Sequence, residues 1–204
     1  MVRIIRFDSL LKYVAYTTVA LSIGIYAFVQ AIWLPDYSLF KVVTISSVVS
    51  TFLVTLLMLP SFSRRIWAFI GYINESVYPD LNGTWQGEIT LEDGKAIDVR
   101  AVVRQSLLST EIDIHGETMK SVTLDTTPSM EAGQRKLYYV YRADPKNPAW
   151  PSYCGSTIFD VRRAQMKGKC QLELSGKYFT DRKTVGRIVL RQLGTNNNHD
   201  VSFY

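Results

Sequence analysis

The fold class follows from one stretch of the chain, Ala96-Ile97-Asp98-Val99-Arg100-Ala101-Val102-Val103-Arg104. Apart from Val102, its apolar side chains alternate with charged ones, so every second residue faces the same side. This alternation is typical of a β-strand with one buried face. The residues just before it, Glu92-Asp93-Gly94, are a hairpin turn signal, which predicts a partner strand on their other side.

Similar alternating runs fill the chain after residue 82. They predict eight strands, over residues 83–90, 96–104, 110–115, 118–125, 135–143, 154–163, 168–177 and 184–192. No helical periodicity interrupts these runs. Strands joined in order by short turns favour an all-β, eight-stranded, small up-and-down barrel, with a β-sandwich as the alternative. Such a barrel has room for packed side chains or for one small ligand.

Two apolar stretches precede the strands. Residues 13–34 and 42–59 contain no charged side chain, and they are 22 and 18 residues long. As helices, both can cross a hydrocarbon core of about 30 Å, the second only just. We therefore expect a two-helix transmembrane hairpin before the barrel. The length of the first stretch and the presence of a second argue against a signal peptide. A buried helical hairpin of a soluble domain is the alternative.

The flanking charges predict how this hairpin is oriented. Basic residues precede the first stretch and follow the second, whereas the short turn between them carries Lys41 offset by Asp36. The positive-inside rule then places both termini of a multi-pass membrane protein in the cytoplasm. Small and hydroxylated residues lie along one side of each stretch. They suit close helix packing, either within one chain or between chains.

These patterns divide the chain into three parts. Residues 1–74 hold the two predicted spans and a juxtamembrane segment, in which residues 62–78 are expected to form an amphipathic interfacial helix. Residues 75–194 form the predicted cytoplasmic ligand-binding barrel, and residues 195–204 a flexible tail. The longest connection between strands, residues 144–151, contains three prolines and predicts a lid or a rigid surface loop.

The charge distribution narrows the class of ligand. Residues 75–204 carry 17 basic and 16 acidic side chains, and a nearly neutral domain is a poor binder of DNA or RNA. Within it, however, residues 162–191 hold nine basic side chains against two acidic ones. This local excess suits either a small ligand that carries phosphate or anionic lipid headgroups.

Catalytic and metal-binding patterns are missing from the sequence. It contains no Gly-x-Ser-x-Gly and no Walker-type glycine loop, and its two histidines, His115 and His199, belong to no convincing catalytic set. Cys154 and Cys170 are not at the spacing of zinc ligands. We therefore expect a protein that is not an enzyme and holds neither a metal ion nor a cofactor.

The candidate ligand-binding residues combine aromatic, cationic and hydroxyl side chains. The densest group is Tyr178, Arg182, Lys183 and Thr184, in which an aromatic ring can stack on a base while the others bind phosphate. A hairpin turn with solvated charges is the alternative for this group. The remaining candidates are Tyr139 and Tyr141, predicted to point inward, Trp85, which fits the core at least as well, and Arg104, expected on the polar face of its strand.

Two motifs frame the predicted barrel. They are Asp80-Leu81-Asn82-Gly83-Thr84-Trp85-Gln86-Gly87 at its start and Gly176-Lys177-Tyr178-Phe179-Thr180-Asp181-Arg182-Lys183-Thr184-Val185-Gly186 near its end. With the two apolar stretches, they make the chain resemble the two-transmembrane β-barrel effectors of bacterial cyclic-oligonucleotide-based anti-phage signalling systems (CBASS). The resemblance covers nearly the whole chain except the tail.

This resemblance implies a function for the barrel. The barrel would bind a cyclic dinucleotide made by a partner nucleotidyltransferase after phage infection. Binding would drive homo-oligomerisation among the lipids of the inner membrane, disrupt that membrane, and kill or arrest the infected cell. Two other hypotheses stay open: a membrane-tethered, lipocalin-like barrel that senses or carries an apolar ligand, and a structural adaptor with a filled barrel.

Overall fold

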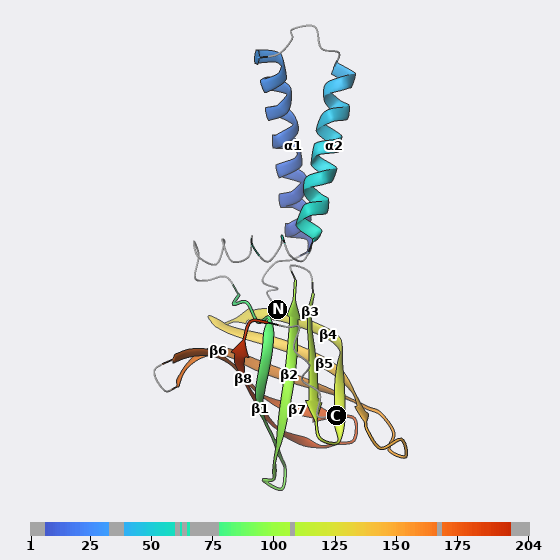
Figure 1. The fold of residues 1–204 in the computed structure, drawn as a ribbon, viewed down its shortest axis with the longest axis vertical. Coiled ribbons are helices and arrows are strands. Elements are labelled where there is room, and N and C mark those ends of the chain that lie inside the picture. Colours follow the sequence, from blue (N-terminus) through green and yellow to red (C-terminus); the bar gives the residue numbers. More distant parts are fainter. Residues whose placement is uncertain are drawn as a thin grey trace. The chain divides into compact units, whose positions relative to one another are not determined.

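The computed structural model describes residues 7–32, 39–59, 62, 65, 78–106, 109–166 and 169–196. The chain divides into two compact units, a pair of helices and a β-barrel (Figure 1). Two predictions lie largely outside the described residues. Of the interfacial helix expected at 62–78, the structure describes Phe62, Arg65 and Tyr78, and of the tail it describes Thr195 and Asn196.

The first unit consists of α1 (Phe7–Ile32) and α2 (Leu39–Met58), which pack against each other. Both apolar stretches therefore form helices, as predicted. Three threonine hydroxyls of α2, those of Thr44, Thr51 and Thr55, donate to the carbonyl four residues earlier at 2.8–2.9 Å. A hydroxyl bonded to its own helix contributes little to a neighbouring helix, so the expected threonine contacts between helices are weaker than the pattern suggested.

The assignment of these helices as membrane spans is not confirmed. In the part of the chain that the structure describes, no helix has both the length and the apolar character needed to cross a bilayer. Large apolar side chains are nevertheless exposed on both helices. Tyr16 and Ile23 on α1 are 70% and 63% exposed, and Phe40 and Phe52 on α2 are 79% and 62% exposed.

The second unit is a closed barrel of eight strands in sequence order. They are β1 (Gly83–Leu91), β2 (Ala96–Gln105), β3 (Thr110–Gly116), β4 (Met119–Glu131), β5 (Gln134–Pro145), β6 (Tyr153–Met166), β7 (Lys169–Thr180) and β8 (Val185–Gly194). Each strand pairs antiparallel with the next, and β8 pairs with β1 to close the barrel. The predicted up-and-down barrel is confirmed, and the sandwich is excluded.

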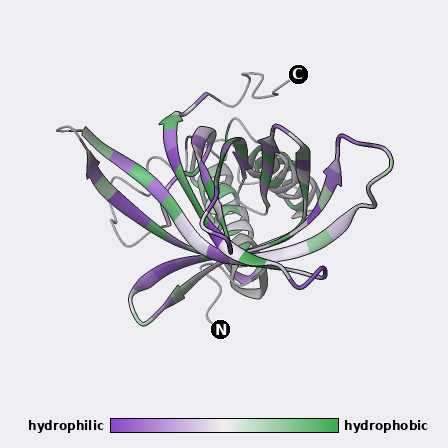
Figure 2. Cartoon of the chain, turned by 90° about the horizontal axis from the view of Figure 1, so that it is seen from below, coloured by the Kyte–Doolittle hydropathy of each residue, from purple (hydrophilic) through white to green (hydrophobic). Residues whose placement is uncertain are grey.

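The strand sequences explain the barrel's interior. Hydrophobic and hydrophilic residues alternate along the strands (Figure 2), so one set of side chains points inward. Inward residues such as Leu137, Phe159, Leu174 and Leu190 are fully buried. Removal of their apolar surface from water provides the main driving force for closure of the sheet.

One end of the barrel is filled by residues 78–82, through which the chain enters β1. Asn82 Nδ2 donates to the Gln105 carbonyl at 3.0 Å, and Asn82 Oδ1 accepts from the Gln105 amide at 2.8 Å. The buried Trp85 donates its indole N–H to the Leu81 carbonyl at 3.0 Å. Leu81 itself is fully buried. The motif at residues 80–87 therefore fastens the entering chain to the barrel and closes this end.

Candidate functional site

A cavity of about 260 Å³ lies at the other end of the barrel. Because the strands alternate in direction, the β1–β2, β3–β4, β5–β6 and β7–β8 connections meet at this end. The deeper lining is apolar and includes Ile89, Val99, Ile114 and Ile188. The polar and aromatic lining residues are Thr118, Ser121, Tyr141, Tyr153, Thr157, Tyr178, Arg182 and Thr184.

Two tyrosine rings in this lining lie against glycines of the adjacent strand. Tyr141 on β5 is paired with Gly155 on β6, and Tyr178 on β7 is paired with Gly186 on β8. A Cβ on either glycine would come within 2.5 Å of the facing tyrosine ring. Only a residue without a side chain leaves room for each ring, so these glycines fix where the aromatic surface of the cavity lies.

The aromatic surface continues below Tyr141. The Tyr141 ring stacks on the Tyr139 ring, with centroids 5.0 Å apart and an interplanar angle of 22°. The Tyr139 ring is tilted against the Phe159 ring, with centroids 6.1 Å apart. Pairs of aromatic rings at such centroid distances stabilise the fold beyond the burial of their apolar area. The cavity therefore has a rigid aromatic wall, held from behind by buried rings.

Arg182 joins two of the connections that surround the cavity mouth. Its guanidinium lies 4.2 Å from the centroid of the Tyr153 ring and donates a hydrogen bond to the Pro151 carbonyl. The β7–β8 turn that carries it is itself fixed, since the Asp181 carboxylate accepts from the Cys154 amide at 2.9 Å. The arginine thus links this turn to the end of the proline-rich connection at residues 144–151.

Burial sets the protonation of the cavity's tyrosines. It raises the pKa of Tyr141 well above the ordinary value, with smaller contributions from Tyr153, Tyr178 and Asp181. Burial likewise raises the pKa of Tyr153, although the Arg182 charge opposes this, and it raises the pKa of Tyr178. These hydroxyls therefore remain protonated at neutral pH and can act as hydrogen-bond donors.

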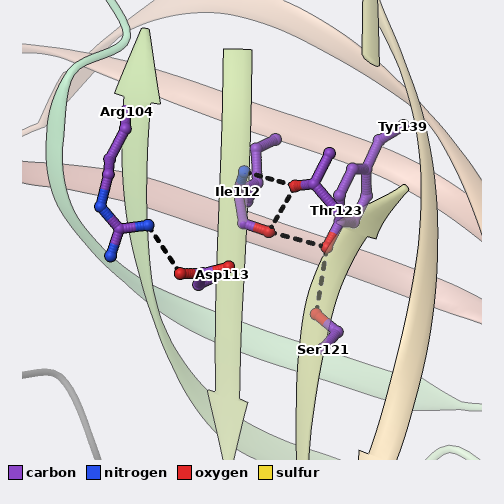
Figure 3. Close-up of polar contacts among 6 residues, drawn as sticks. All are labelled: Arg104, Ile112, Asp113, Ser121, Thr123 and Tyr139. Atoms are coloured by element: carbon purple, nitrogen blue, oxygen red, sulfur yellow. Dashed lines mark hydrogen bonds and ion pairs between the residues drawn. The ribbon is translucent and has the colours of Figure 1, made fainter. Parts of the chain in front are cut away.

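The pairing of β3 with β4, two strands that contribute to the cavity lining, is incomplete (Figure 3). We call this β3–β4 boundary the seam. Backbone pairing of these strands covers Ile114 with Ser121 and His115 with Lys120. Around Ile112 on β3, side-chain hydrogen bonds take the place of backbone bonds between the two strands. Thr123 Oγ1 accepts from the Ile112 amide at 2.7 Å and donates to its carbonyl at 2.9 Å, and the buried Tyr139 hydroxyl donates to the same carbonyl at 3.0 Å.

Ser121 connects this seam to the cavity. It lines the cavity, and its hydroxyl lies 3.0 Å from that of Tyr139 (Figure 3). With the Tyr139 proton directed at Ile112, Ser121 donates to Tyr139. A register shift between Thr123 and Asp125 makes a bulge in β4, and Leu124 within it is 54% exposed. The cavity and the seam are therefore two sides of one wall.

The structure places four of the eight predicted site residues in the cavity lining and the other four outside it. Tyr141, Tyr178, Arg182 and Thr184 line the cavity. Tyr139 lies directly behind it, and Lys183 is exposed in the β7–β8 turn with a positive φ of 61°. The other two lie elsewhere, because Trp85 is buried near the closed end and Arg104 is on the outer face, paired with Asp113 at 2.7 Å (Figure 3). The role of all eight residues in ligand binding stays a prediction.

Sequence reasoning missed four polar lining residues, Thr118, Ser121, Tyr153 and Thr157. Thr157 could have been found, since alternation puts it on the same face as Phe159, and it pairs across the sheet with Tyr178. Tyr153 gives no comparable signal, because it follows the proline-rich connection and its partner Arg182 is far away in the sequence.

This set of side chains can bind a ligand that is both aromatic and anionic. The tyrosine rings offer faces for stacking, Arg182 offers a planar pair of donors, and the hydroxyls of Thr157 and Thr184 offer further hydrogen bonds. Across the described ranges, no group of three or more His, Cys, Asp or Glu residues is placed to hold a metal ion.

Comparison with known proteins supplies a family. A family model described as "Cap15, cyclic dinucleotide receptor domain" matches residues 76–192, which is more than half of the 204-residue chain. The matched region contains the closed end, the cavity and nearly all of the eight strands. A comparison with curated proteins found no match.

Proposed function

The chain belongs to the family of Cap15 cyclic dinucleotide receptor domains, and from this premise we propose that it is a CBASS effector whose barrel binds a cyclic dinucleotide in the cavity. The observation that carries the proposal is the meeting of Tyr141, Tyr178 and Arg182 at one cavity. A cyclic dinucleotide presents two bases for stacking and two phosphodiesters for an arginine, so each part of this site has a counterpart in the ligand.

The size of the cavity suggests how the ligand lies. Pockets for small molecules usually measure about 300–1,000 Å³, whereas this one measures about 260 Å³. We expect one base to enter the cavity beside Tyr141 and Tyr178, and the rest of the ligand to occupy the mouth. Stacking of a base on an aromatic side chain contributes about 1–3 kcal/mol, so this arrangement accounts for a large part of the affinity.

Arg182 gives ligand binding a structural consequence. Here it bonds the Pro151 carbonyl and lies on the Tyr153 ring. A phosphodiester at the mouth offers it a charged acceptor, and hydrogen bonds between charged groups are stronger than those to a neutral carbonyl. Recruitment of Arg182 by the ligand would release residues 144–151 from the β7–β8 turn, so the liganded and free barrels would differ at this end.

The proposed output is assembly of effector chains at the bacterial inner membrane, with both termini in the cytoplasm, followed by membrane disruption and death or arrest of the infected cell. A partner nucleotidyltransferase would supply the ligand. Support comes from the apolar side chains of α1 and α2, such as Ile23 and Phe52, that are exposed in the described part of the chain. Contact with lipid or with helices of other copies would cover them. Fractionation of cells that express the full chain tests the membrane location.

Calorimetry of the purified full-length protein tests ligand binding. The probes are cyclic di-GMP, cyclic di-AMP and cyclic di-UMP, which differ in their bases. We expect one of them to bind, and Arg182→Ala to weaken it by about 10- to 100-fold, because a hydrogen bond to a charged group contributes about 1.5–3 kcal/mol. Arg163→Ala is the matched control, since Arg163 on β6 is exposed and outside the lining, and this variant should bind nearly as wild type.

Two outcomes would contradict the proposal. Absence of binding to every probe would remove the receptor function, and equal binding by wild type and Arg182→Ala would remove this cavity as the site. A second candidate function, binding of an apolar ligand, is favoured by the apolar lining of Ile89, Ile114 and Ile188. This second function predicts that a fatty acid binds to Arg182→Ala with the same affinity as to wild type.

A further inference from the structure

The outer face of β6–β8 carries apolar side chains that are exposed among the described residues. Phe179 on β7 and Val185 on β8 are directly paired and are 50% and 38% exposed. Ile158 on β6, one row away, is 45% exposed. An exposed cluster of apolar side chains on a folded domain commonly marks a contact surface.

The same surface carries two cations in an unusual arrangement. Lys177 and Arg187 are directly opposite each other on β7 and β8, and both are exposed. Like charges at opposed positions destabilise a sheet. Among the described residues, no ion pair joins either of them to a carboxylate, although Glu173 farther along the same face is paired with Arg162 and Arg191. We call Ile158, Lys177, Phe179, Val185 and Arg187 the β6–β8 face.

The incomplete seam provides a surface of the opposite charge. A groove of about 450 Å³ runs along it, and its lining includes Glu111, Asp113, Leu124 and Asp125 but no basic side chain. Arg104 lies directly opposite Glu111 in the β2–β3 ladder, but its ion pair is with Asp113. For Glu111 and Asp125, both exposed, the described residues supply no ion pair. Together with the exposed Leu124, these two carboxylates form what we call the β3–β4 groove.

The two surfaces lie on opposite sides of the barrel. In the closed order of eight strands, β7 is four strands from β3 in either direction. One copy can therefore present its β6–β8 face to the β3–β4 groove of another without using up its own groove. A contact between two different patches is heterologous, and it continues from copy to copy until a ring closes or a filament forms.

We propose that a second copy of this chain docks its β6–β8 face on the β3–β4 groove. Lys177 and Arg187 would then meet Glu111 and Asp125, and Phe179 would pack near Leu124, so charges and apolar surfaces left unmatched in one chain are matched in the pair. The inference rests on the proposed function, for which it names the surfaces of assembly. It also gives ligand a means of control, because Ser121 and Tyr139 connect the cavity lining to Ile112 at the seam.

Charge reversal in the full-length protein tests this contact. Lys177→Glu with Arg187→Glu gives a face variant, and Glu111→Lys with Asp125→Lys gives a groove variant. The control is Glu88→Lys with Asp98→Lys, a paired and exposed set on β1 and β2 that belongs to neither surface. Sedimentation gives the average mass of each protein with and without cyclic di-GMP, cyclic di-AMP or cyclic di-UMP, and calorimetry gives binding.

Wild type and the control should increase several-fold in mass when ligand binds. The face variant and the groove variant should each bind ligand as wild type does but lose this increase. An equimolar mixture of the two should recover it, because each mixed contact joins either two native surfaces or two reversed ones. Assembly should also weaken as salt concentration rises, since exposed charges are screened.

Two results would overturn the inference: variants that assemble as wild type does, or a mixture that fails to recover while both variants still bind ligand. If wild type bound none of the three probes, the proposed function would fail separately. The dependence of average mass on protein concentration would then decide the inference in the same samples. A wild type that stayed monomeric at every concentration would refute it.

Discussion

Gly155→Ala should destabilise the barrel and push an aromatic ring into the cavity. A Cβ at this position would lie 2.5 Å from both Cζ and Oη of Tyr141 and 2.9 Å from the Phe179 carbonyl oxygen. The carbonyl belongs to the β-ladder, so the ring is the group that has to move. Overpacking of this kind costs about 1–3 kcal/mol, whereas the lower entropy of unfolded alanine stabilises by about 0.4–1 kcal/mol. We expect a net loss of about 1–2 kcal/mol.

Gly116→Ala is the matched control, because Gly116, like Gly155, is a buried glycine in a strand at this end of the barrel. A Cβ there would lie 3.7 Å from Met119 and 3.8 Å from Val99, which is ordinary van der Waals contact. Its stability should be unchanged or should rise by up to about 1 kcal/mol. Urea unfolding of the full-length variants, followed by circular dichroism, gives both free energies of unfolding.

The comparison is decisive because both substitutions add one methyl group at a buried glycine of the same end of the barrel. Equal stability of the two variants would refute the argument that Gly155 exists to accommodate the Tyr141 ring. The double variant Gly155→Ala/Tyr141→Ala locates the strain, since the cost of alanine at 155 should shrink once the ring is removed. An unchanged cost would assign the strain to the Phe179 carbonyl instead.

Three further predictions concern other parts of the barrel. Asn82→Ala should lower the free energy of unfolding in urea by about 2 kcal/mol, because it leaves the backbone groups of Gln105 without their partners. Tyr139→Phe should cost about 1 kcal/mol, and it should speed amide hydrogen exchange near Ile112, whose carbonyl loses a donor. Burial opposes ionisation of Glu173, but the hydrogen bonds and charges of its two arginine partners outweigh burial and hold its pKa below the usual value. Its charge therefore stabilises the fold above the pKa of an unfolded glutamate, about 4.3, and this contribution is lost as pH falls through the folded pKa. Glu173→Gln should unfold at lower urea than wild type at neutral pH, and the two midpoints should converge in acid.

Alternation predicted all eight strands because a closed barrel has one inner and one outer surface, but it ended the fourth strand at residue 125, whereas β4 continues to Glu131. Tyr139 and Tyr141 point inward and Arg104 outward, as their positions in the pattern indicated. The β3–β4 seam could not be predicted in this way. It depends on a bulge at Leu124 and on hydroxyls that replace backbone bonds, and a bulge changes the register without leaving a clear trace in composition.

The site was harder to predict than the fold. Arg182 and Tyr178 were found because they lie in one motif, but the cavity also needs Tyr153 and the two glycines that accommodate the rings. These relations cross between strands, and a period of two along one strand does not indicate which residues face each other across the sheet. Trp85 illustrates the converse, since its large aromatic ring serves the closed end and not the cavity.

The direct pairing of β1 with β8 has a practical consequence for sensor engineering. Thr84 lies opposite Gly194, so the two ends of the barrel's chain emerge side by side at the closed end. A short linker can therefore join them, and new termini can be opened at Ala132-Gly133, where both residues have positive φ in the tight β4–β5 turn. That turn is also at the closed end, because alternate connections share an end. A fluorescent reporter fused there would leave the ligand's entrance unobstructed while reporting on the wall that separates the cavity from the seam.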